Sequence, residues 1–130
     1  MPDPDIELLA AALRRDSADL TLYARVLAET LTDSLPPGTV RVERTRTLAD
    51  RLAGREGTVG AVDIALGEQR LSLRTHAGAA TGEIRHEVRG IVLSRRPVTL
   101  EEWTDALARA LAQAAASNAR AREAVERFLT

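Results

Sequence analysis

Cysteine is missing from this chain of 130 residues, which excludes disulfides, thiolate metal ligands and cysteine nucleophiles together. A long apolar run is missing too, because no stretch approaches the roughly 20 apolar residues that span a bilayer. The N-terminal sequence MPDPDIELLA is acidic where a signal peptide carries positive charge. We therefore expect a cytoplasmic protein with no membrane partner, folded around a single core.

Lysine is also absent, so arginine supplies all 18 basic side chains, and alanine fills 23 positions. GC-rich codons produce this usage, which makes a high density of arginine a weaker sign of anion recognition. The chain has one Phe, one Tyr and one Trp, all in expected helices, and these are too few to stack on nucleic-acid bases. With a formal net charge of −1, the composition disfavours a nucleic-acid partner but leaves room for a phosphate-binding strip.

Capping signals and hydrophobic spacing predict helices at both ends of the chain. Apolar residues recur at three- and four-residue spacing within residues 4–35, so we expect one helix with a break near Arg15 or two helices in series. Near the other end, Thr99 and Glu102 match a capping box. A long helix is therefore expected over residues 100–128.

Between these helices the hydrophobic period changes to two, the period of a half-buried strand. Alternation begins at Val40, and the sequence LGEQ that ends at Gln69 suits a two-residue hairpin loop. Residues 76–82 are interpreted as a flexible loop and residues 83–94 as one strand with a bulge at Gly90. The sequence thus predicts a single α+β domain, with helical residues 4–35, a four-stranded antiparallel meander over residues 39–94, and the helix of residues 100–128.

No catalytic or metal-binding pattern is found in the sequence. His76 and His86 have no HxH, HExxH or carboxylate cluster beside them, and His86 is expected to pack at the sheet rather than to act on a substrate. The sequence GREGTVG of residues 54–60 lacks the ending of a P-loop and the strand and helix of a dinucleotide site, so it is interpreted as a turn. We predict no enzymatic activity, no metal and no cofactor.

Charge is distributed unevenly along the chain. Residues 39–96 hold 11 arginines and 7 acidic residues, an excess of four positive charges. Residues 1–38 hold 3 arginines and 7 acidic residues, an excess of four negative charges. The two regions either neutralise one another or leave a cationic surface for an anion or an acidic protein partner.

The stretch RVERTRTLADRLAGREG, residues 41–57, carries five arginines. Strand alternation places Arg44 and Arg46 on the nominally buried face, where an unpaired guanidinium is costly. Either the strand leaves the core by residue 44, or these arginines line a cleft or reach an acidic partner such as Asp50, Glu56 or the first helix. Thr47 and Asp50 are expected to cap a short helical turn that follows the strand. The candidate anion site consists of Arg44, Arg46, Arg51 and Arg55.

The inward-facing positions of the expected C-terminal helix form a seam, with large side chains at its start and small ones through its second half. The small side chains permit a partner helix to approach closely, although each contact buries little apolar area. Packing of this seam on the chain's own sheet is the alternative. We predict a homodimer that acts as a non-catalytic binding or adaptor protein; the alternative function is an anion or nucleic-acid binding protein that uses the arginine strip. The interface residues expected on the seam are Trp103, Leu107, Ala110, Ala114 and Ala121.

Two stretches, VERTRTLADRLAGREGTV and VRGIVLSRRPVTLEEW, resemble a family of arginine-rich, lysine-poor actinobacterial proteins that has no assigned activity. The resemblance covers residues 40–128. It implies a bacterial cytoplasmic protein, and it carries over no functional residue, cofactor or partner.

Overall fold

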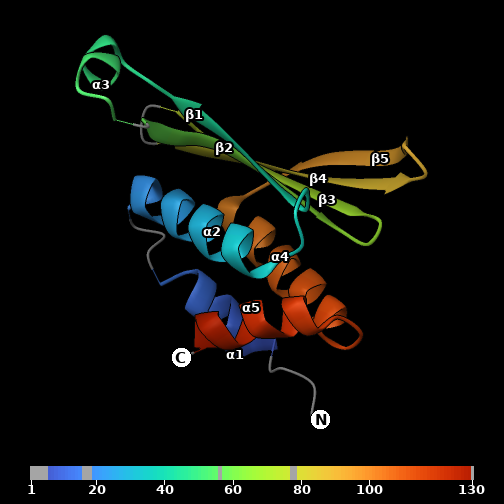
Figure 1. The fold of residues 1–130 in the computed structure, drawn as a ribbon. Coiled ribbons are helices and arrows are strands. Elements are labelled where there is room, and N and C mark those ends of the chain that lie inside the picture. Colours follow the sequence, from blue (N-terminus) through green and yellow to red (C-terminus); the bar gives the residue numbers. More distant parts are fainter. Residues whose placement is uncertain (1–5, 16–18, 56, 77–78, 130) are drawn as a thin grey trace.

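The computed structural model describes residues 6–15, 19–55, 57–76 and 79–129, and these residues form helices on one face of an antiparallel sheet (Figure 1). The predicted α+β class is therefore confirmed. The helices are α1 (Ile6–Leu13), α2 (Leu20–Ser34), α3 (Leu48–Leu52), α4 (Leu100–Ala115) and α5 (Ala119–Leu129). The strands are β1 (Val40–Thr45), β2 (Thr58–Leu66), β3 (Gln69–His76), β4 (Ala79–Val88) and β5 (Ile91–Val98), in the spatial order β1-β2-β3-β4-β5.

Across the described residues the sheet is an antiparallel meander as predicted, but it has five strands rather than four. Gly90 is not a bulge within one strand. Arg89 and Gly90 both adopt positive φ, 53° and 84°, which is the backbone of a two-residue hairpin turn, and Val88 pairs with Ile91 across it. The predicted flexible loop is also wrong in large part, because β3 reaches His76 and β4 begins at Ala79.

The first hairpin and the alternation of its strands are confirmed. Leu66 pairs with Gln69 around Gly67, which has φ 59°, so the two-residue loop lies where LGEQ predicts it. The apolar residues at alternate positions of the three central strands face the helices and are buried: Val62, Ile64, Leu66, Leu71, Leu73 and Ile84. The residues between them face away from the helices.

The N-terminal helical region consists of two helices in series. Its first expected residues, 4 and 5, lie outside the described residues. Asp19 is the N-cap of α2, and its side chain accepts a hydrogen bond from the backbone N–H of Leu22 at 3.1 Å. Helix α2 ends at Ser34, before the PPG sequence, because proline cannot continue a helix.

The long C-terminal helix is a wrong prediction, because the chain turns after Ala115 and resumes as the shorter helix α5. Asn118 causes the restart. Its side-chain oxygen accepts hydrogen bonds from the backbone N–H groups of Arg120 at 2.9 Å and Ala121 at 3.2 Å, which is the action of an N-cap. Helix α5 then folds back along α4, where alanines allow close packing.

The core lies between the sheet and two layers of helices. Helices α2 and α4 pack directly on the sheet, and α1 and α5 lie beyond them (Figure 1). Trp103 is fully buried against β4, where a Cβ at Gly82 would come within 3.0 Å of the Trp103 side chain, so a side chain at this position would require Trp103 to move by a few tenths of an ångström. Tyr23 and Thr104 share a hydrogen bond in this core, and burial raises the pKa of the Tyr23 hydroxyl to about 12.

Candidate functional site

The four arginines of the predicted anion site lie at one end of the sheet, in the segment that leads from β1 through α3 to β2. We call residues 44–57 the α3 corner. The register of β1 on β2 shifts between Glu43 and Arg44, and all residues from Glu43 to Ala49 are exposed. Strand β1 therefore leaves the core at residue 44, which is one of the two outcomes that the alternation permits. Arg44 still pairs with the buried Val59 of β2, and the extra residue of the register shift is Gly60 of β2. Glu56, another acidic partner considered for these arginines, lies outside the described residues.

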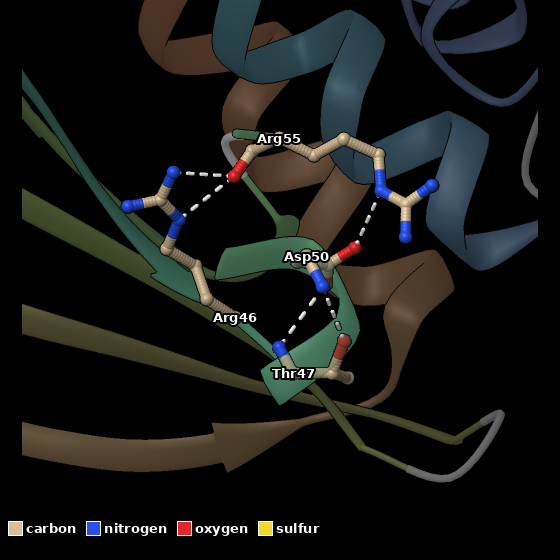
Figure 2. A network of polar contacts seen from close by, with 4 residues as sticks. All are labelled: Arg46, Thr47, Asp50 and Arg55. Atoms are coloured by element: carbon tan, nitrogen blue, oxygen red, sulfur yellow. Dashed lines mark hydrogen bonds and ion pairs between the residues drawn. The ribbon is translucent and has the colours of Figure 1, made fainter. Parts of the chain in front are cut away.

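Two of these arginines hold the corner together (Figure 2). The guanidinium of Arg46 donates hydrogen bonds to the backbone carbonyl of Arg55, one of them at 2.8 Å from Nε. The guanidinium of Arg55 points away from Arg46 and donates from Nε to Asp50 Oδ1 at 3.0 Å. These two side chains are thus occupied by partners within the corner, and they do not converge on one point.

The predicted capping box at the start of α3 is confirmed. Thr47 Oγ1 accepts from the backbone N–H of Asp50, and Asp50 Oδ2 accepts from the backbone N–H of Thr47, both at 3.1 Å. The hydrogen bonds from Thr47, with a smaller contribution from Arg55, lower the pKa of the Asp50 carboxyl. The other two predicted residues, Arg44 and Arg51, are exposed.

The residues predicted for an oligomer interface lie inside the fold of one chain. Trp103, Leu107 and Ala121 are completely buried, Ala110 is nearly so, and Ala114 is half-buried. The seam packs on the sheet and on the other helices, which is the alternative that the sequence leaves open. Self-association stays a prediction. These five side chains are not exposed enough in the single chain to form its interface.

A different group of arginines gathers on the face of the sheet that the helices leave uncovered. This face is hollowed into a groove of about 800 Å³. It arises from the strand period of two, since the residues that alternate with the buried apolar positions all point to this side. We call it the arginine groove. Its charged lining residues are Arg41, Arg70, Arg74, Arg85 and Arg95 with Asp63, Glu83 and Glu87.

The strand register aligns three of these arginines in a row. Arg70 of β3 pairs with Arg85 of β4, which pairs with Arg95 of β5. Neighbouring strands lie roughly 4.7–4.9 Å apart, so the row places like charges directly opposite one another, which is destabilising unless other charges compensate it. This arrangement across three strands is the most unusual feature of the groove.

The carboxylates of the groove compensate the row unequally. Arg70 is well paired, with its Nε 2.8 Å from Glu87. Glu83 serves both remaining arginines with one oxygen, Oε1, which lies 3.8 Å from Nε of Arg85 and 3.6 Å from Nε of Arg95. Both distances exceed a hydrogen bond. Nε of Arg85 is accordingly buried without a hydrogen-bond partner among the described residues.

Ser72 and Arg74 are engaged within the sheet, whereas Arg41 is exposed and lies opposite Asp63 in the register of β1 and β2. The hydroxyl of Ser72 donates to Asp63. Arg74 reaches Glu43 at 3.4 Å. Across the lining, five arginines face three acidic residues, an excess of two positive charges. The positive charge of the groove that is least compensated therefore lies at Arg85 and Arg95, which share one carboxylate, and at the exposed Arg41.

Other chemistry is sparse in the described part of the chain. His86 is at the edge of the helix-facing side, with Nε2 2.6 Å from Glu68 Oε2, and His76 lies at the far end of β3. Among the described residues there is no group of three or more histidine, cysteine, aspartate or glutamate side chains that could hold a metal ion. None of the helices described here combines the length and the apolar character that crossing a membrane would require.

Comparison with known proteins adds no relative: no family model matches the chain, and no curated protein or solved structure is significantly similar to it. The resemblance to actinobacterial proteins stays a prediction.

Proposed function

We propose that this chain is a non-catalytic binding protein that takes a small anionic ligand, through phosphate or carboxylate groups, into the arginine groove. The observation that carries the proposal is the row of Arg70, Arg85 and Arg95, in which the buried Nε of Arg85 has no hydrogen-bond partner among the described residues. Guanidinium groups bind phosphate and carboxylate oxygens with two parallel hydrogen bonds. A ligand anion in the groove would therefore give Arg85 and Arg95 the hydrogen-bond acceptors that Glu83 does not provide, since its oxygen lies 3.8 and 3.6 Å from them.

The groove favours a small ligand over a nucleic acid. Its volume of about 800 Å³ lies within the range of small-molecule sites. Asp63, Glu83 and Glu87 stand among the arginines, and these carboxylates would repel a continuous phosphate backbone while tolerating one or two localised anionic groups. The proposal therefore moves the anion site from the α3 corner to the open face of the sheet and keeps nucleic acid as an alternative that the experiment tests.

The test is calorimetric titration of the whole chain with pyrophosphate and, separately, with citrate. Binding of either is expected, and Arg85→Gln should weaken it by about tenfold or more, since a hydrogen bond to a charged group contributes roughly 1.5–3 kcal/mol. Arg25→Gln is the matched control, because Arg25 is an exposed arginine on α2, on the helix side of the sheet. The control variant should bind like the wild type.

Two results would overturn the proposal. One is the lack of binding of either anion at millimolar concentration. The other is stronger binding of a 20-base-pair DNA duplex than of pyrophosphate, with an affinity that falls steeply as salt rises, because that slope is characteristic of many phosphate contacts. Equal weakening by Arg85→Gln and Arg25→Gln would assign the effect to net charge and would also contradict a site in the groove.

A further inference from the structure

The described part of the sheet has two edge strands, β1 and β5. Strand β1 is short and alternates charged with apolar residues, a pattern that discourages pairing with another chain. Strand β5 has two more residues than β1, and every position from Ile91 to Pro97 is exposed. Its second half carries such protection too, in Arg95, Arg96 and Pro97, and its register on β4 shifts beside Leu93, but the first three residues of the strand are apolar and exposed.

The free edge of β5 begins with three consecutive apolar side chains. Ile91 is 65% exposed, Val92 40% and Leu93 60%. The β4–β5 hairpin that carries them projects beyond the helices (Figure 1). Single exposed apolar residues are ordinary, but a contiguous group on an unpaired strand edge is typical of an interaction site.

The charge of β5 is of one sign. The strand and its preceding turn contain Arg89, Arg95 and Arg96, and no acidic residue lies between Arg89 and Val98. Their ion pairs are longer than a hydrogen bond, at 3.6 Å from Arg95 to Glu83 and 3.8 Å from Arg96 to Glu102, and both arginine side chains are more than half exposed. An incoming strand therefore meets an apolar segment followed by a positively charged one.

From this pairing of features we infer that β5 takes up an extended, acidic and apolar segment of a partner protein as a sixth strand of the sheet. Backbone hydrogen bonds along the free edge supply affinity, and the apolar and arginine side chains of β5 supply selectivity. Charge complementarity selects the partner. A second copy of β5 would place six arginines along one shared edge with no carboxylate from either strand, whereas an acidic segment compensates them.

The test uses a synthetic nine-residue peptide of alternating valine and glutamate, labelled for fluorescence anisotropy, with a valine and lysine peptide as the charge control. The acidic peptide is expected to bind and the basic one is not. The double variant Ile91→Ser/Leu93→Ser should weaken binding by about tenfold, because two exposed apolar contacts are lost. Leu48→Ser is the matched control, since Leu48 is a leucine of α3 at 73% exposure, and it should leave binding unchanged.

Hydrogen exchange locates the site independently of the variants' stability. Backbone amides of β5 should gain protection when the acidic peptide binds, and those of β1 should not. Absence of binding at millimolar peptide, equal binding of the basic peptide, or protection at β1 instead of β5 would each overturn the inference. So would a dimer in sedimentation equilibrium that Ile91→Ser/Leu93→Ser dissociates, because a second copy would then occupy the edge.

Discussion

The α3 corner and the arginine groove use the same residue type for opposite purposes. In the corner, Arg46 donates to the backbone carbonyl of Arg55, and Arg55 donates to Asp50. These hydrogen bonds stabilise the conformation of an exposed loop. In the groove, Arg85 and Arg95 share one distant carboxylate oxygen. The density of arginine is higher in the sequence of the corner, yet the cationic capacity is higher in the groove. The number of arginines in a stretch of sequence is thus a poorer guide to an anion site than the strand register, because the register determines which side chains are their neighbours.

The largest expected effect comes from reversing charge in each region. Arg85→Glu should weaken anion binding by about 100-fold, or about 2.7 kcal/mol, because it removes a donor and adds repulsion at the centre of the row. Arg55→Glu should leave that affinity within about twofold, since Arg55 acts within the corner. Calorimetry with pyrophosphate measures both. Equal losses in the two variants would show that the comparison between the regions is wrong.

Replacing Gly57 tests whether the α3 corner has a structural role rather than a role in anion binding. Gly57 has φ 94°, and a Cβ there would lie 2.5 Å from the carbonyl oxygen of Thr45. Gly57→Ala should therefore destabilise the fold by about 1–3 kcal/mol and leave anion binding unchanged. Urea denaturation gives the first quantity and calorimetry the second. A control is Gly38→Ala, where positive φ is also required but no atom lies within 4 Å, so a smaller loss is expected.

Removing the carboxylate that Arg85 and Arg95 share tests whether Glu83 competes with the ligand for these arginines. Glu83→Gln leaves Arg85 and Arg95 without their common partner, so pyrophosphate should bind about three- to tenfold more tightly, as expected when an interaction of roughly 1 kcal/mol no longer competes with the ligand. Stability should fall slightly, because the like charges of the row lose their compensation. Weaker ligand binding would indicate that Glu83 contacts the ligand instead.

The smallest effect is the response of the corner to acid. The pKa of Asp50 is lower in the folded chain than its ordinary 3.8, so the stabilisation is complete above that pH and is lost as the pH falls through the folded value. The protection of the α3 amides, measured against their intrinsic exchange rates at each pH, should fall below about pH 4 in the wild type. In Asp50→Asn this fall in protection should be absent, and pyrophosphate binding near pH 7 should be unchanged. An identical pH profile for the two proteins would contradict the role assigned to Asp50.

Part of this architecture could be predicted from local signals. Thr47 with Asp50, Thr99 before α4, and Gly67 at the first hairpin each act within a few residues, and each lies where the pattern indicates. The second hairpin and the α4–α5 break were also encoded locally, by Arg89-Gly90 and by Asn118. The sequence pattern does not predict them, because a glycine in a strand is also compatible with a bulge and because a short interruption is hard to recognise in an alanine-rich helical sequence.

The groove could not be located in the same way. The strand period puts Arg70, Arg74 and Arg85 on the solvent side, but only the pairing of β3 with β4 and of β4 with β5 places Arg85 between two other arginines. The register shift beside Glu43 and Arg44 is likewise a property of the β1–β2 pair: Gly60 of β2 is the extra residue, and Arg44 stays opposite the buried Val59 although its own side chain is exposed. A one-residue change of register would alter every one of these neighbours.

By itself, the sequence determined the α+β class, the caps, the first hairpin and the apolar face of the sheet, since these depend on residues close together in the chain. Tertiary structure alone decided that the alanine seam is internal, that Arg46 and Arg55 serve the corner, and that Arg70, Arg85 and Arg95 form one row. The reason is physical: the partners of these side chains lie on other strands and helices, and their positions follow from the packing of the whole chain.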